Sequence, residues 1–89
     1  MHTIYDPDGG FQNTLTDGEP EHKDFIAELY HNGEFLALIH LDRGCDNPSV
    51  EIHPRKDGAP WSFDLREFES ALVQTRGRLL AFTESGDDA

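Results

Sequence analysis

The sequence predicts an α+β fold, an antiparallel sheet of four to five strands with one C-terminal amphipathic helix packed on one face. Three observations predict it. An Asn-Gly pair divides a β-prone run at residues 25–42, apolar residues recur at spacings of three and four over residues 65–82, and every strand candidate precedes that helix. Strands grouped before a helix are typical of two-layer α+β domains. In a chain of 89 residues we expect one domain over residues 1–84 and a mobile acidic tail over residues 85–89.

The first elements are two weak strand candidates, Thr3–Tyr5 and Phe11–Leu15, which flank a Pro-Asp-Gly-Gly turn. A stronger signal follows at Phe25–Leu41, where two β-prone runs flank Asn32 and Gly33. This dipeptide tolerates the positive φ angles of a type I′ turn, so we expect a tight β-hairpin here.

The two-residue turn predicts the pairing of the hairpin, with Tyr30 opposite Phe35 and Ala27 opposite Leu38. One face then carries a core set, namely Phe25, Ala27, Leu29, Leu36 and Leu38. The other face carries Ile26, Glu28, Tyr30, Phe35, Ala37, Ile39 and Leu41. The second face of a two-layer domain is normally polar, whereas this one is mostly apolar. We expect it to be covered by another molecule or by the amino-terminal segment, through Ile4, Tyr5, Phe11 and Leu15.

The last elements follow the hairpin. Ser49–His53 alternates as a short strand with Val50 and Ile52 inward, and Pro60–Phe63 is a further strand candidate. Asp64, with Glu67 three residues later, resembles a capping box and marks the start of the helix. The apolar stripe of the helix comprises Leu65, Phe68, Leu72, Thr75, Leu79 and Phe82.

Composition narrows the range of functions. Seven Lys and Arg against 18 Asp and Glu give a formal net charge of -11, which argues against binding to nucleic acid or to anionic membrane surfaces. The amino terminus shows no secretion signal, and the longest nearly apolar run, Phe35–Leu41, is far below the roughly 20 residues that span a bilayer. One cysteine, Cys45, rules out an internal disulfide. We therefore expect a cytoplasmic protein.

Catalytic and metal signatures are absent from the sequence. The tightest grouping of potential ligands is His40, Asp42, Cys45 and His53, but its spacing matches no zinc motif, so we predict no metal and no cofactor. Asp6–Gly10 resembles the start of a calcium loop and then departs from that pattern. No nucleophile motif or phosphate-binding glycine loop is present. We predict that the protein is not an enzyme.

With these functions disfavoured, we predict that the chain binds another protein. Aromatic anchors inside a charged rim are typical of interfaces, and an acidic surface suits a basic partner. The residues that we expect to bind it are Glu28, Tyr30, Glu34, Phe35, Ile39, Asp42 and Asp46. Trp61, Phe63, Phe68 and Leu72 are expected to hold the scaffold. The alternative is a self-associating structural or regulatory module, a homodimer formed through the open sheet edge or the second face.

The layout of a Phe25–Leu41 hairpin, a Ser49–His53 strand, a Pro-Trp-Ser-Phe-Asp-Leu segment at residues 60–65 and a Leu65–Phe82 helix, in a small acidic chain, resembles the immunity proteins of bacterial polymorphic and contact-dependent toxin systems. The resemblance covers residues 25–82, and these families share no invariant motif. It implies an antitoxin that binds a cognate toxin, such as a basic nuclease, and blocks its active site or substrate surface. An acidic phage-encoded inhibitor of a nucleic-acid-processing enzyme would have the same features.

Overall fold

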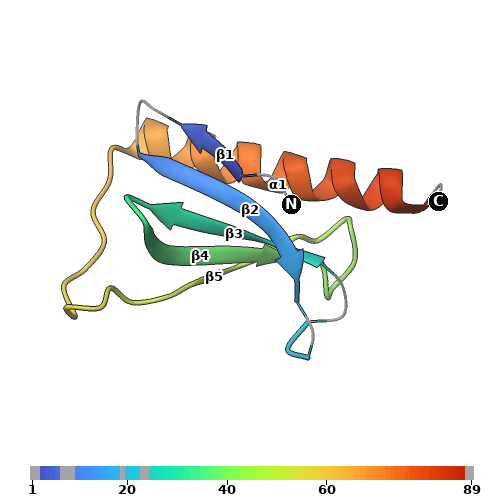
Figure 1. Cartoon of the computed structure of the whole chain (residues 1–89), viewed down its shortest axis with the longest axis horizontal. Coiled ribbons are helices and arrows are strands. Elements are labelled where there is room, and N and C mark those ends of the chain that lie inside the picture. The colour runs from blue at the N-terminus through green and yellow to red at the C-terminus, as the bar shows by residue number, and fades with distance from the viewer. Residues whose placement is uncertain (1–2, 7–9, 19, 23–24, 88–89) are drawn as a thin grey trace.

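A computed structural model describes residues 3–6, 10–18, 20–22 and 25–87, and it confirms the α+β architecture. Helix α1 (Leu65–Asp87) lies along one side of a sheet (Figure 1). The sheet is antiparallel throughout, and its strands follow one another in chain order. They are β1 (Thr3–Asp6), β2 (Phe11–Asp17), β3 (Phe25–His31), β4 (Glu34–His40) and β5 (Ser49–Ile52).

The β3–β4 turn has the predicted conformation. Asn32 and Gly33 have φ angles of 49° and 86°, as a type I′ turn requires. His31 pairs with Glu34 next to the turn, and Tyr30 pairs with Phe35 as predicted.

Further along the hairpin, the predicted pairing is wrong because a β-bulge interrupts it. Leu29 pairs with Ala37 and not with Leu36, so Leu36 is an extra residue in β4. An extra residue reverses the alternation of side chains beyond it. Ala37, Ile39 and Leu41 therefore face the helix, and Leu38 faces the opposite side. The carbonyl of Leu36 accepts a hydrogen bond of 2.8 Å from the backbone N–H of His53, just after β5.

The core lies between the sheet and α1, mainly over β3. Its first part comprises Phe11, Leu29, Leu36, Ala37 and Ala71, with Trp61, Phe63, Phe68 and Leu72 packed against it. The second part comprises Leu15, Ala27, Ile39 and Leu79, with Leu41 and Leu72 at its border. The four predicted scaffold residues are thus confirmed as partners of the core. Phe11 and Leu15 belong to this helix-facing side, so they do not cover the opposite face.

Polar groups position α1. The Asp64 carboxylate accepts a hydrogen bond of 3.1 Å from the N–H of Glu67, which confirms the predicted cap. Arg78 Nη1 donates to both the backbone and side-chain oxygens of Asn13, at 3.0 and 2.8 Å, and so joins the helix to β2. The helix continues through residues 85–87, which the sequence analysis assigned to the tail, and residues 88–89 lie outside the described part.

Two predictions about β5 and its surroundings are wrong. Residues 60–63 form no strand, and Trp61 Nε1 donates a hydrogen bond of 2.7 Å to the carbonyl of His53. Val50 and Ile52 face the side of the helix but remain 47% and 58% exposed. The reason is that α1 lies over β3 and leaves the edge strand β5 largely uncovered.

Replacement of Leu79 by Ala should lower the free energy of unfolding by about 2–5 kcal/mol, because this side chain is fully buried and the change leaves a cavity. Val73→Ala is the matched control on the same helix, since Val73 is 53% exposed and should cost less than about 1 kcal/mol. Urea denaturation of both variants measures the difference. Equal losses would contradict the position of α1 described here.

Candidate functional site

The face of the sheet opposite α1 carries both apolar and ionisable side chains. The strand pairing places four apolar or aromatic residues and three ionisable ones on this face. They are Ile26, Glu28, Tyr30, Phe35, Leu38, His40 and Glu51. Ile26 and Leu38 are 5% and 7% exposed. The apolar second face predicted from the sequence is therefore smaller than expected, since the bulge moves Ala37, Ile39 and Leu41 to the core.

A hollow of about 420 Å³ lies on this face. The backbone turns back after β2, where the N–H of His22 donates to the carbonyl of Gly18 at 2.8 Å, and these residues form one wall. The described residues that line the hollow include four acids and no Lys or Arg. They are Asp17, Gly18, Glu21, His22, Ile26, Glu28, Phe35, Leu38, Glu51 and His53. The hollow combines an apolar floor with acidic walls.

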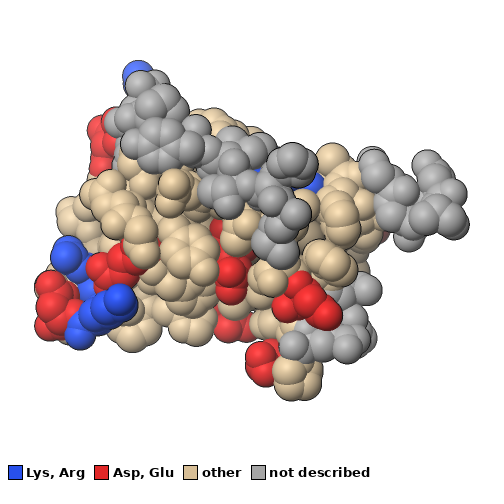
Figure 2. All heavy atoms as spheres, viewed as in Figure 1, with Lys and Arg blue, Asp and Glu red and all other residues tan. Residues whose placement is uncertain are grey.

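The distribution of charge over the surface is uneven. In the view of Figure 2, most of the visible Lys and Arg atoms lie together at the lower left, next to acidic side chains, and further acidic side chains lie at the upper left, in the middle and at the lower right of the molecule. Acids within a hollow create a stronger local negative potential than the same acids on a convex surface, because the low-dielectric walls focus the field. This arrangement attracts cationic groups.

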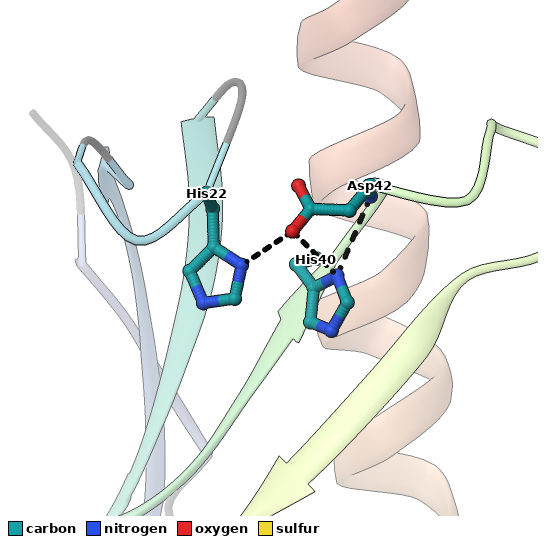
Figure 3. Close-up of side chains that lie close together, drawn as sticks. All are labelled: His22, His40 and Asp42. Atoms are coloured by element: carbon teal, nitrogen blue, oxygen red, sulfur yellow. Dashed lines mark hydrogen bonds and ion pairs between the residues drawn. The ribbon is translucent and has the colours of Figure 1, made fainter.

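Two histidines from distant parts of the chain meet beside the hollow. His22 lies on the connection between β2 and β3, and His40 ends β4, yet their rings stack with centroids 4.5 Å apart. Oδ2 of Asp42 lies between the Nδ1 atoms of the two rings, at 2.8 Å from His22 and 3.6 Å from His40 (Figure 3). On the other edge, Oε2 of Glu51 lies 3.5 Å from Nε2 of His22 and 3.8 Å from Nε2 of His40.

The group of potential metal ligands differs from the one considered in the sequence. His40 and Asp42 are brought together with His22, and the three donor atoms lie within 4.8 Å of one another. Cys45 is exposed on the loop before β5 and is not part of the group. His40 pairs with Ser49 across the strands, so His53 is not its neighbour. His22 was missed because it lies in a connection with no periodic pattern.

The predicted partner-binding residues do not form one surface. Glu28 and Phe35 line the hollow, and the ring of Tyr30 packs edge-on against Phe35 at 5.6 Å. Asp42 binds His22, and Asp46 is exposed on the loop after β4. The two remaining residues lie elsewhere. Glu34 faces the side of the helix and accepts a hydrogen bond from the N–H of Lys56, and Ile39 is 5% exposed in the core.

The prediction for Ile39 is therefore corrected, because the bulge turns its side chain toward Leu15 and Leu79. The structure adds Asp17, Glu21, His22, Leu38, Glu51 and His53 to the residues around the hollow. Their meeting depends on the bulge and on the turn at Gly18. Neither feature has a sequence signal that a reading of periodicity detects.

Searches against protein-family models, curated proteins and solved structures find no match to this chain. Within the described residues, no helix combines the length and the apolar character that a bilayer crossing requires.

The hydroxyl of Tyr30 donates a hydrogen bond of 3.0 Å to Oε1 of Glu28. Burial raises the pKa of Tyr30 above its usual value of about 10, and the hydrogen bond to Glu28 and the negative charge of that residue raise it further. A raised pKa favours the folded state at low pH, so this contribution to stability is complete below pH 10 and is lost as the pH rises through the pKa of folded Tyr30.

In a Tyr5→Phe chain, which retains Tyr30 as its only tyrosine, the tyrosinate absorbance should therefore titrate with a midpoint above 10. Adding Glu28→Gln should lower that midpoint, because the carboxylate charge is removed while burial remains. Glu69→Gln, on the exposed surface of α1, is the control and should leave the midpoint unchanged. A midpoint that does not respond to Glu28→Gln would contradict the contact.

Proposed function

We propose that this chain is a cytoplasmic binding protein that neutralises a basic protein, in the manner of an immunity protein acting on a nuclease-like toxin. The observation that carries the proposal is the acidic hollow opposite α1. Asp17, Glu21, Glu28 and Glu51 surround an apolar floor, and none of the described lining residues is Lys or Arg.

The size of the hollow suits protruding side chains of a partner and not a whole domain. At about 420 Å³ it falls within the range of roughly 300–1,000 Å³ that is usual for ligand pockets. A Lys or Arg on a loop of the partner would place its charged head among the carboxylates. Its aliphatic stem would pack on Ile26, Phe35 and Leu38. The site thus fits a cationic loop, such as those that contact phosphates in nucleases.

Charge and apolar contact have different kinetic effects. Opposite net charges raise the association rate constant toward ~10⁸–10⁹ M⁻¹s⁻¹ at low salt, and the net charge of -11 supplies one side of that attraction. Buried aromatic contacts mainly slow dissociation. Rapid capture and slow release are what an inhibitor of a harmful basic enzyme needs. In this proposal the chain acts by occupying the partner's surface and performs no chemistry itself.

Affinity capture from the source cells, with the chain as bait, should yield a basic protein whose activity is lost at a 1:1 ratio. Glu28→Gln with Glu51→Gln should lower the association rate constant about tenfold at low salt, and Phe35→Ala should mainly raise the dissociation rate constant. Surface plasmon resonance at two salt concentrations separates the two effects. The identity of the captured protein decides whether the chain is an antitoxin or a phage-type inhibitor of a nucleic-acid-processing enzyme.

The matched control for this experiment removes two charges from the opposite side of the molecule. Glu67→Gln with Glu69→Gln changes the net charge by the same amount on exposed positions of α1. If this control slows association as much as the hollow variant does, the hollow is not the binding site. An acidic captured partner would contradict the proposal as a whole.

A second candidate function, self-association, is favoured by the uncovered edge strand. β5 ends the sheet order, and Val50 and Ile52 lie exposed beside Leu65 and Val73, which are 68% and 53% exposed on α1. Unpaired strand edges with exposed apolar side chains are sites of pairing between chains.

This candidate predicts a mass of twice 10.0 kDa by light scattering at high concentration. Ile52→Lys should return the mass to that of one chain, because a charge at an edge strand opposes pairing. Glu28→Gln, in the hollow, is the control and should not change the mass. A single-chain mass for the unmodified protein at every concentration would exclude the candidate.

A further inference from the structure

We propose that His22, His40 and Asp42 form a binding site for a divalent transition-metal ion of the Zn²⁺ class. This site goes beyond the proposed partner binding and does not depend on it. It rests on the geometry of the three donor atoms, on the proton positions of the two rings, and on the charge and burial of their surroundings.

The donor atoms are close to the spacing that a four-coordinate ion requires. Zn²⁺ binds nitrogen and oxygen ligands at about 2.0–2.1 Å, so neighbouring ligands of a tetrahedral site are roughly 3.3 Å apart. Asp42 Oδ2 lies 2.8 Å from His22 Nδ1 and 3.6 Å from His40 Nδ1. The three atoms fall within 4.8 Å of one another (Figure 3). Because the two rings are stacked with 28° between their planes, the rings must rotate for both Nδ1 lone pairs to point at one ion.

The hydrogen bonds of His40 give it the tautomer that the site needs. The backbone N–H of Asp42 donates to His40 Nδ1 at 3.3 Å, so this nitrogen carries a lone pair and not a proton. A bound ion would take over this lone pair and break the hydrogen bond to the Asp42 N–H. The ring proton is then on Nε2, which faces Glu51 Oε2 at 3.8 Å. A neutral imidazole whose second nitrogen faces a carboxylate is the usual arrangement of metal-binding histidines.

His22 requires one proton shift. Its Nδ1 lies 2.8 Å from a carboxylate oxygen, which can only accept, so this nitrogen carries the proton when no ion is bound. On binding, the ion takes the place of that proton between His22 and Asp42. The ring proton then resides on Nε2, which faces Glu51 Oε2 at 3.5 Å. Glu51 thus faces both rings from outside the ligand set.

The surroundings favour a cation with two charges. Asp42 and Glu51 place two carboxylates on opposite edges of the two rings, and the His22 and His40 side chains are 9% and 13% exposed. A partly buried pair of carboxylates gains stability from a bound cation. In the described part of the chain, the carboxylates of Asp42 and Glu51 lie within 4.0 Å of the ring nitrogens of both histidines.

The ligand types select the class of ion. Two imidazole nitrogens and one carboxylate oxygen suit Zn²⁺, Co²⁺ or Ni²⁺, whereas Ca²⁺ and Mg²⁺ prefer sets made only of oxygen. Three protein ligands leave the fourth position of a tetrahedral ion for water or for an atom of another molecule.

Titration of the purified chain with CoCl₂ and ZnCl₂ tests the site without any partner. We expect saturable 1:1 binding and the visible absorption of tetrahedral Co²⁺, without the thiolate charge-transfer band that Cys45 would produce. His22→Gln, His40→Gln and Asp42→Asn should each weaken binding at least tenfold. Glu51→Gln should weaken it about tenfold through the orientation of the rings.

Matched controls are His53→Gln, a histidine of the same face outside the ligand set, and Cys45→Ser. Both should bind Co²⁺ within twofold of the unmodified chain. Circular dichroism of each variant establishes that it is folded before titration. The titration of the unmodified chain tests the site even if a variant does not fold. The proposal is overturned if that chain shows no saturable binding of either ion, if a thiolate band is present, or if His40→Gln binds as tightly as His53→Gln. Because no partner takes part, such a failure would leave the partner-binding proposal untouched.

Discussion

The β-bulge at Leu36 is the constraint on which the rest of the structure depends. Leu36 and the next residue, Ala37, both enter the core beneath α1, so the side chains beyond them alternate in the opposite sense. His40 consequently projects away from the helix, where the His22 ring stacks on it. The carbonyl of Leu36 also accepts the N–H of His53 and so holds the chain after β5. One extra residue thus shapes both the core and the opposite face.

The two faces of the sheet contribute to stability in different ways. The helix side buries apolar area, which is the main source of stability in a domain of this size. The opposite side gathers acids, whose mutual repulsion opposes folding. Histidines between these acids reduce the cost, because an imidazole N–H can donate a hydrogen bond to a carboxylate. The Asp42–His22 contact is the clearest case. Hydrogen bonds of this kind hold the acidic side chains in place while the face keeps its negative potential.

Local signals made much of the fold predictable from the sequence. The Asn32–Gly33 turn, the Asp64 cap and the part of the helix stripe from Phe68 to Leu79 each depend on neighbours in the chain, and each is present, whereas the two ends of the predicted stripe, Leu65 and Phe82, are 68% and 39% exposed. The bulge was not predictable, because residues 35–39 are all apolar and give no polar marker of which side chain faces water. The candidate site was predicted only in part, through Glu28 and Phe35. His22 and Glu51 reach it through tertiary contacts between segments far apart in the sequence.

The Arg78–Asn13 contact has a consequence for how the layers can move. Apolar packing is non-directional, so a smooth aliphatic seam by itself would let a helix slide along its axis at little cost. A guanidinium that donates to two oxygens of β2 at 3.0 and 2.8 Å would lose both bonds within a fraction of one turn. Arg78 therefore acts as an axial stop, and thermal displacement of α1 along the sheet must begin by breaking this pair.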